Sequence, residues 1–148
     1  GMKYLESKGF ADRVTLFDTS SATVELAAAA LGSTPGEIAK SLTFMVGEQP
    51  IMILFEGEAR VDNQKYKALF GTKAKMLKFD EVEELIGHPV GGVCPFGIKE
   101  GVKVYLDESL KKHATVYPAA GSGNSAVRIN IEEFAELLPE AEWIDVSK

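Results

Sequence analysis

The sequence predicts a mixed α/β fold of the α+β type, with a largely antiparallel central sheet and short helices around it. Residues 41–46 and 51–55 are apolar segments separated by a turn that contains glycine and proline, which is typical of a β-hairpin. Residues 126–131 alternate apolar and polar side chains, as in a half-buried strand. The regular strand–helix–strand alternation of a Rossmann-like sheet is missing, so that class is not expected.

Periodicity and turn residues place the elements along the chain. The expected helices cover residues 3–9, 23–31, 35–39, 63–70, 81–86 and 132–138. The expected strands cover residues 14–17, 41–46, 51–55, 73–77, 102–106, 115–117, 126–131 and 143–146. These short, interspersed elements are what a mixed sheet with surrounding helices requires.

Cap residues mark the ends of the expected helices. Thr34 and Glu37 have the spacing of a capping box around Pro35, which favours a helix start there. The other expected N-caps are Ser20 or Ser21, Asp62, and Asp80 with Glu83. The expected C-terminal stops are Gly32, Gly71 and Gly87.

The composition predicts a single globular domain over residues 1–148. The chain is 45% hydrophobic and 26% charged, and its length allows a sizeable core. It has no 18-residue apolar run and no secretory signal, so we expect no membrane association. Gly1 before Met2 is typical of a remnant of tag removal. Cys94 is the single cysteine, which excludes an intrachain disulfide and favours a cytoplasmic location.

The charge is acidic overall but unevenly distributed. A net charge of −6 argues against broad, nonspecific nucleic-acid binding. However, the segment 63–78 carries five lysines and no acid, whereas the segment 132–145 carries six acids and no base. The lysine-rich segment is either a solvated surface or a local contact to a phosphate backbone, and the sequence leaves both interpretations open.

Two glycine-rich loops are the strongest candidates for a binding site. They cover residues 91–97 and 121–125, and each is also compatible with an ordinary tight turn. As pocket walls, their backbone N–H groups could polarise a carbonyl or hold a water. Lys40, at the entry to an apolar strand, could then contact a phosphate or carboxylate, although a cation at a helix C-terminus is the simpler interpretation.

Cys94 invites a second catalytic hypothesis, a thiol nucleophile activated by a histidine. The chain offers His88 and His113, which both read as surface or turn residues. A small thiol that packs the loop is therefore the favoured interpretation of Cys94. No zinc-type spacing of ligands is present, so neither a metal nor another cofactor is expected.

Several motifs in one order resemble a known family. They read AAAALG at 27–32, IAKSLTF at 38–44, RVD at 60–62, GGVCPFG at 91–97 and YPAAGS at 117–122, with Ser125 and Ala126 after it. Together they resemble the YbaK/EbsC family, also called the prolyl-tRNA synthetase-associated editing domain. The resemblance extends from about residue 23 to residue 137.

The resemblance implies a compact mixed α/β domain whose mostly antiparallel sheet curves around a pocket. It also implies hydrolysis, in trans, of the ester that links a wrong amino acid to a tRNA 3′ end, with alanine or cysteine on tRNAPro as the expected substrates. The implied partners are the acceptor end of the aminoacyl-tRNA and, potentially, prolyl-tRNA synthetase. An activated ester needs little acid–base machinery, which agrees with the absence of an evident triad.

The family's functional residues transfer onto matching positions. Lys40 is the implied catalytic residue, which would engage the terminal adenosine or its phosphate. The implied substrate-binding residues are Thr23, Ser41, Thr43, Gly91, Gly92, Pro95, Gly97, Gly121, Ser122 and Ser125. Thr23 stands where some cysteine-editing relatives have tyrosine, which weakens a transfer of cysteine specificity. The alternatives are a noncatalytic module of the same fold that binds an aminoacyl group, a nucleotide or a synthetase, and a hydrolase that uses Cys94.

Overall fold

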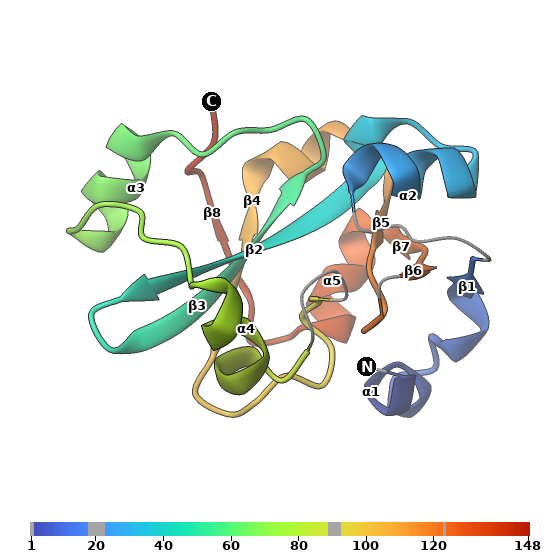
Figure 1. Cartoon of the computed structure of the whole chain (residues 1–148). Coiled ribbons are helices and arrows are strands. Elements are labelled where there is room, and N and C mark those ends of the chain that lie inside the picture. Colours follow the sequence, from blue (N-terminus) through green and yellow to red (C-terminus); the bar gives the residue numbers. More distant parts are fainter. Residues whose placement is uncertain (1, 18–22, 89–92, 123) are drawn as a thin grey trace.

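The computed structural model describes residues 2–17, 23–88, 93–122 and 124–148 (Figure 1). Its α-helices are α1 (Met2–Ser7), α2 (Val24–Leu31), α3 (Asn63–Phe70), α4 (Phe79–Ile86) and α5 (Phe134–Leu137). Its strands are β1 (Val14–Leu16), β2 (Ile38–Val46), β3 (Gln49–Glu56), β4 (Lys103–Asp107), β5 (Thr115–Pro118), β6 (Ser125–Val127), β7 (Ile129–Asn130) and β8 (Glu142–Ile144). Short 3-10 turns cover Ala11–Arg13, Pro35–Glu37, Glu108–Lys112 and Ile131–Glu133. No described helix has the length and apolar character that crossing a membrane requires.

The described strands form a six-stranded mixed sheet in the order β7-β5-β2-β3-β4-β8, with β1 and β6 paired separately. The long β2–β3 hairpin is antiparallel over eight residue pairs, and β5–β7 and β1–β6 are also antiparallel. The shorter pairings of β2 with β5, β3 with β4, and β4 with β8 are parallel. The predicted mixed α/β class with a largely antiparallel sheet is therefore confirmed, although the sequence did not reveal the parallel pairings.

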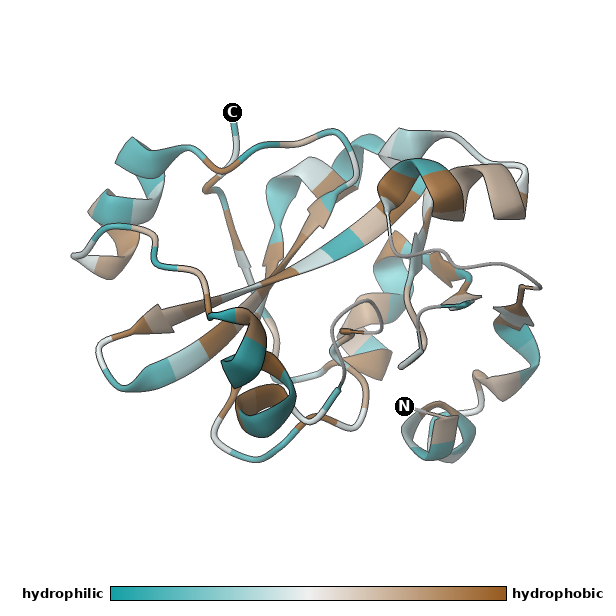
Figure 2. Cartoon of the chain, in the orientation of Figure 1, coloured by the Kyte–Doolittle hydropathy of each residue, from teal (hydrophilic) through white to brown (hydrophobic). Residues whose placement is uncertain are grey.

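The two faces of the β2–β3 hairpin pack against different apolar clusters. Strand residues alternate between faces, so Met52 and Leu54 pack into the larger cluster, which includes Phe96. Phe44, Ile51, Ile53 and Phe55 face a smaller cluster with Tyr66 and Val146. Figure 2 shows the hydrophobic colouring along these central strands and hydrophilic colouring on α3. Burial on both faces fixes the hairpin register, because a slip of one residue would exchange the faces.

Two expected N-caps are wrong. The N-cap of α2 is Thr23, whose hydroxyl accepts a hydrogen bond from the Leu26 N–H at 3.1 Å, whereas Ser20 and Ser21 lie outside the described residues. Helix α4 starts two residues earlier than expected, because Lys78, not Asp80, is the cap residue. The carboxylate of Glu81 accepts the Lys78 backbone N–H at 2.9 Å and so closes that end.

Several helices and strands have other bounds than the sequence predicts, mainly because strands pair with distant parts of the chain. The expected helix over residues 35–39 ends after Glu37, since Ile38 and Ala39 pair with β5 instead. The expected strand 73–77 is reduced to one bridge, between Met76 and Phe44. The expected strand 126–131 is two strands, because β6 pairs with β1 and β7 pairs with β5. Likewise, the final expected helix is a 3-10 turn that continues into α5, and the final strand is shifted to Glu142–Ile144.

Candidate functional site at the open edge of β2

One edge of β2 is open between two partners. On that edge β5 pairs with Ile38 and Ala39. Further along, the Leu77 N–H donates to the Thr43 carbonyl at 3.1 Å and the Met45 N–H donates to the Lys75 carbonyl at 2.8 Å. Backbone polar groups alternate in direction along a strand, so Ser41 directs its N–H and C=O to this same edge. Among the described residues, nothing pairs with Ser41 there.

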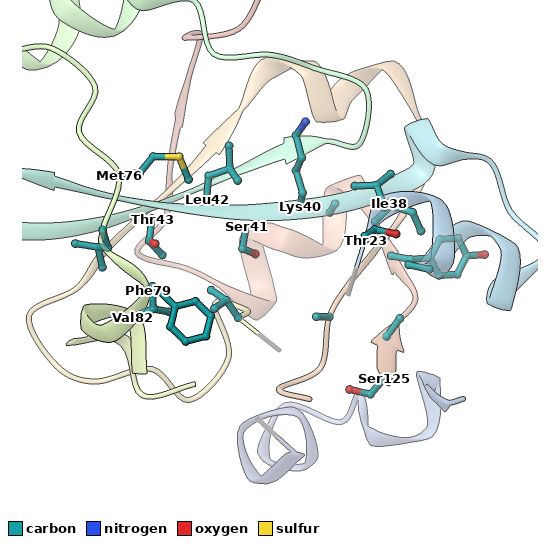
Figure 3. Close-up of a pocket in the computed structure, with 18 residues that line it drawn as sticks. Thr23, Ile38, Lys40, Ser41, Leu42, Thr43, Met76, Phe79, Val82 and Ser125 are labelled. Atoms are coloured by element: carbon teal, nitrogen blue, oxygen red, sulfur yellow. The ribbon is translucent and has the colours of Figure 1, made fainter. Parts of the chain in front are cut away.

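A pocket of about 520 Å³ lies along this open edge (Figure 3). Its walls come from α2, β2, the start of α4, β5 and β6. The lining side chains and backbone belong to Thr23, Val24, Ala27, Ile38, Ala39, Lys40, Ser41, Leu42, Thr43, Met76, Leu77, Phe79, Val82, Val93, Tyr117, Ala119, Ser125 and Ala126. The lining is mainly apolar with a few polar groups, as is usual for a small-molecule site.

The polar groups of β2 extend from both faces of the strand. Lys40 and Leu42 extend from one face, and Ser41 and Thr43 extend from the other toward Phe79 and Val82 (Figure 3). This is the alternation that a β-strand imposes. Lys40 and the two hydroxyls therefore reach the pocket from opposite sides of its central strand.

The Lys40 ammonium is held by backbone carbonyls. It donates to the Gly57 carbonyl at 3.2 Å and to the Ala59 carbonyl in a short hydrogen bond. Burial lowers the pKa of Lys40, as does the charge of Arg60, whereas Glu56 and Glu25 oppose the shift. An ammonium group has three donors, so one remains for which the described residues supply no acceptor. That donor can bind an anionic or carbonyl oxygen of a ligand.

The turn that holds Lys40 is itself fixed from three sides. The Glu56 backbone N–H donates to Ser109 Oγ at 3.1 Å, and the Glu56 carboxylate accepts the Glu58 N–H. His113 Nε2 lies 3.1 Å from Glu56 Oε2. Gly57 packs so closely that a Cβ there would lie 1.8 Å from the Pro35 carbonyl oxygen. Because the turn cannot shift freely, the position of the Lys40 ammonium is also restricted.

The hydroxyls of the site differ in their availability. Ser41 Oγ is buried and has no hydrogen-bond partner among the described residues. Ser125 Oγ accepts a hydrogen bond from Ser122 Oγ at 2.7 Å. Thr23 Oγ1 is engaged in capping α2. Ser41 therefore offers open backbone groups to a ligand, whereas its unpaired hydroxyl oxygen has almost no exposed surface.

The structure brings together five of the predicted site residues at the pocket: Thr23, Lys40, Ser41, Thr43 and Ser125. Gly121 and Ser122 belong to the adjoining loop, where Gly121 has a φ of 106° and Ser122 supports Ser125. Pro95 and Gly97 instead line a second cavity of about 600 Å³ with Tyr4 and Val102. Gly91 and Gly92 lie outside the described residues.

Sequence reasoning missed the residues that enclose Lys40 and the apolar rim. The Glu56–His113 pair joins residues 57 positions apart, so no local signal could reveal it. Phe79 and Met76 line the pocket although both are largely exposed. A detectable signal did exist for Phe79, since it precedes Val82 and Ile86 at helical spacing.

Cys94 is a buried core thiol. Its side chain is inaccessible, and burial raises its pKa to about 11, with a smaller opposing effect of a hydrogen bond with the Phe96 backbone. His88 is also buried, so its expected surface position is wrong, and its Nε2 lies 3.6 Å from Cys94 Sγ. That nitrogen lies 2.7 Å from the Phe96 carbonyl oxygen, to which it must donate its proton. It cannot then accept the thiol proton, so this geometry does not form a nucleophilic Cys–His pair.

Comparison with known proteins assigns the family. The model of the aminoacyl-tRNA editing domain matches residues 18–137, so the chain belongs to this family. The uncharacterized protein YwhH of Bacillus subtilis (strain 168) is 51% identical over 136 residues, which cover 91% of this chain and 87% of YwhH. The proline–tRNA ligase of Aquifex aeolicus (strain VF5) is 33% identical over 90 residues, which cover 60% of this chain but 16% of the ligase.

A solved structure supports the same assignment. The crystal structure of a candidate trans-editing enzyme for prolyl tRNA synthetase matches with a TM-score of 0.88 and 32% identity. The match covers 99% of this chain and 94% of the other. Similarity of this extent applies to the whole architecture, including the strands that form the pocket. The predicted resemblance to the editing domain is therefore confirmed.

Proposed function

We propose that this protein hydrolyses the ester of a misacylated tRNA in trans, and that the aminoacylated 3′ end binds in the pocket at the open edge of β2. The observation that carries the proposal is the grouping of Lys40, Ser41 and Thr43 on one pocket within a domain of the aminoacyl-tRNA editing family. In the reaction, water adds to the ester carbonyl and the ribose oxygen leaves with a proton. The products are a free amino acid and deacylated tRNA.

The described residues can stabilise such a reaction without a triad. The free donor of the Lys40 ammonium suits an oxygen of the terminal nucleotide. The open Ser41 backbone N–H can donate to the ester carbonyl as negative charge develops on its oxygen. Preorganised groups of this kind contribute positioning and electrostatic stabilisation, which an already activated ester requires most.

We infer tRNAPro carrying alanine or cysteine as the substrate. The similarity to parts of proline–tRNA ligases supports tRNAPro as the tRNA of the substrate. It also makes prolyl-tRNA synthetase a candidate partner. The buried position of Thr43 and the apolar side chains around it favour a small amino-acid side chain. Discrimination by size is limited, since one methylene changes the free energy of binding by only about 1–3 kcal/mol.

The test is deacylation of tRNAPro charged with alanine, cysteine, serine or proline, with Lys40→Ala alongside the parent protein. We expect rapid release from one mischarged species and a loss of at least about a hundredfold in kcat/KM on removing Lys40, the usual cost of losing one preorganised donor. Lys112→Ala, an exposed lysine away from the pocket, is the matched control. Unchanged kcat/KM in a folded Lys40→Ala variant would disprove its role.

The noncatalytic binding module remains the alternative outcome of the same experiment. If no charged tRNAPro, and no other aminoacyl-tRNA, is hydrolysed while the deacylated tRNA still binds, the proposed hydrolysis is wrong. Lys40 would then serve binding alone. Synthetase dependence is measured by repeating the assay with prolyl-tRNA synthetase added.

A further inference from the structure

The rim of the pocket carries an exposed aromatic side chain that the proposed chemistry does not use. Phe79 is 80% exposed, although it belongs to the apolar side of α4. Val82 and Ile86 follow it at spacings of three and seven residues, and both are buried. The apolar stripe of the helix therefore continues beyond the core and ends at the pocket, where Phe79 has no covering residue among those described.

Met76 is a second exposed apolar side chain at the rim, on the side of β2 from which Lys40 and Leu42 extend, whereas Phe79 lies on the side of Ser41 and Thr43 (Figure 3). Met76 is 54% exposed and lines the same pocket. The backbone on either side of it is hydrogen-bonded to the edge of β2. The Met45 N–H donates to the Lys75 carbonyl, and the Leu77 N–H donates to the Thr43 carbonyl. Met76 is therefore presented by a fixed segment next to the open edge, which lowers the entropic cost of binding a ligand.

Three exposed lysines lie within a few residues of Met76 and Phe79 in the chain. Lys73, Lys75 and Lys78 are exposed, and none makes an ion pair within the described part of the chain. By contrast, Lys65 of the same basic segment is paired with Asp145. The acids of α4 begin immediately after Phe79, so the run of lysines without an acid ends at the start of this helix. Three unpaired lysines can neutralise a few phosphates of one strand.

We propose that Phe79 and Met76, with Lys73, Lys75 and Lys78, form a docking surface for the single-stranded 3′ end of an RNA, in which Phe79 stacks on a base next to the aminoacylated nucleotide. An exposed aromatic ring beside a positive strip is the usual combination for single-stranded nucleic acid. The inference rests on the proposed function, which puts the aminoacylated nucleotide in the pocket. It adds a location for the nucleotides that precede it in the RNA. It also assigns a role to residues 73–78, the second part of the lysine-rich segment.

The first test uses an uncharged RNA, so that docking is measured apart from hydrolysis. The probe is a fluorescently labelled hairpin that copies a tRNA acceptor stem with its single-stranded 3′ end. We expect Phe79→Ala to weaken binding roughly tenfold, as is typical of losing one stacked base, and Phe79→Trp to retain affinity. Leu69→Ala, another largely exposed apolar residue, on α3, is the matched control and should bind normally. Equal affinities for Phe79→Ala and the parent protein would overturn the proposal.

Stacking has its own readout in the Phe79→Trp variant. We expect the emission of the new indole to be quenched when the RNA saturates the protein, after subtraction of the signal of Trp143 in the parent protein. Emission that stays unchanged at saturation would exclude contact between this side chain and a base. This measurement also separates stacking from a general effect on stability.

The lysines are tested by the salt dependence of RNA binding. Three phosphate contacts on a single strand predict a slope of log affinity against log salt of about −2. Lys75→Gln with Lys78→Gln should make this slope shallower, whereas Lys112→Gln should not. A slope that the double variant leaves unchanged would contradict the lysine contacts, and would favour a protein partner for the apolar rim.

The outcomes distinguish this inference from the proposed function. RNA binding that depends on Phe79, without hydrolysis of any aminoacyl ester, would support docking and reject deacylation. Hydrolysis that depends on Lys40, with kcat/KM and RNA affinity unchanged in Phe79→Ala, would support deacylation and reject docking.

Discussion

His113 Nε2 lies 3.1 Å from Glu56 Oε2, and this pair joins the end of β3 to the start of β5 at the base of the Lys40 site. The Glu56 side chain is 7% exposed and that of His113 is 24% exposed. Since a carboxylate can only accept, the imidazole donates to it. The pair holds the turn whose carbonyls at Gly57 and Ala59 bind the Lys40 ammonium.

Removing this pair should disturb Lys40 indirectly. We expect Glu56→Ala to lower kcat/KM for ester hydrolysis about tenfold, because the turn that positions the ammonium loses its anchor and each 1.36 kcal/mol corresponds to a factor of ten. Glu56→Gln keeps an oxygen acceptor and should restore most of the activity. Glu58→Ala, an exposed neighbour, is the control. Equal losses in the Gln and Ala variants would show that the acceptor geometry is unimportant.

Gly57 should tolerate no side chain. A Cβ there would lie 1.8 Å from the Pro35 carbonyl oxygen and 2.9 Å from Val24 Cγ1, so the backbone itself must move. We expect Gly57→Ala to lower the free energy of unfolding in urea by at least about 2 kcal/mol. Gly9→Ala, at a φ of 80° with nothing within 4 Å, isolates the backbone cost and should lose about 1 kcal/mol. A loss in Gly57→Ala no larger than this would contradict the close approach.

Cys94 should be chemically inert in the native protein. It is fully buried and burial raises its pKa to about 11, so little thiolate exists at neutral pH. We expect iodoacetamide to modify it only as fast as the chain unfolds, measured by mass spectrometry at several urea concentrations. Cys94→Ala should keep kcat/KM within about twofold, whereas a loss of a hundredfold or more, typical of removing a nucleophile, would restore the thiol hypothesis.

His88 should make the stability depend on pH. Burial lowers its pKa in the folded protein, and the hydrogen bond to the Phe96 carbonyl offsets part of this effect. As the pH falls, His88 is therefore protonated in the unfolded chain before it is protonated in the folded protein. The free energy of unfolding is highest above about pH 6.5, and it decreases as the pH falls from there toward the pKa of His88 in the folded protein. Within this window the slope is at most about 1.4 kcal/mol per pH unit.

The measurement is urea unfolding at pH values from 7.5 down to 5, with His88→Gln for comparison. The glutamine amide can still donate to the Phe96 carbonyl but does not titrate, so its stability should change less over this range. If both proteins lose stability equally, His88 is not the group responsible.

Local signals were sufficient for much of the fold. The turn residues at 47–50 and the apolar segments beside them predicted the β2–β3 hairpin, and the structure confirms it, with β3 starting at Gln49, two residues earlier than expected. Asp62 caps α3 as expected, by accepting the N–H groups of Gln64 and Lys65. The family motifs also predicted Lys40 and Ser41 as site residues, without any information on their tertiary contacts. In each case the information lies within a few residues of the chain, where caps, turns and periodicity act.

Tertiary structure decided what the sequence could not. It determined that β4 lies parallel to β3 and β8, that the edge of β2 is open at Ser41, and that Lys40 is held by the turn after β3. It also placed Cys94 and His88 side by side yet without the proton arrangement of a catalytic pair. These outcomes depend on contacts between residues that are far apart in the chain. Local patterns such as caps, turns and hydrophobic periodicity do not report such contacts.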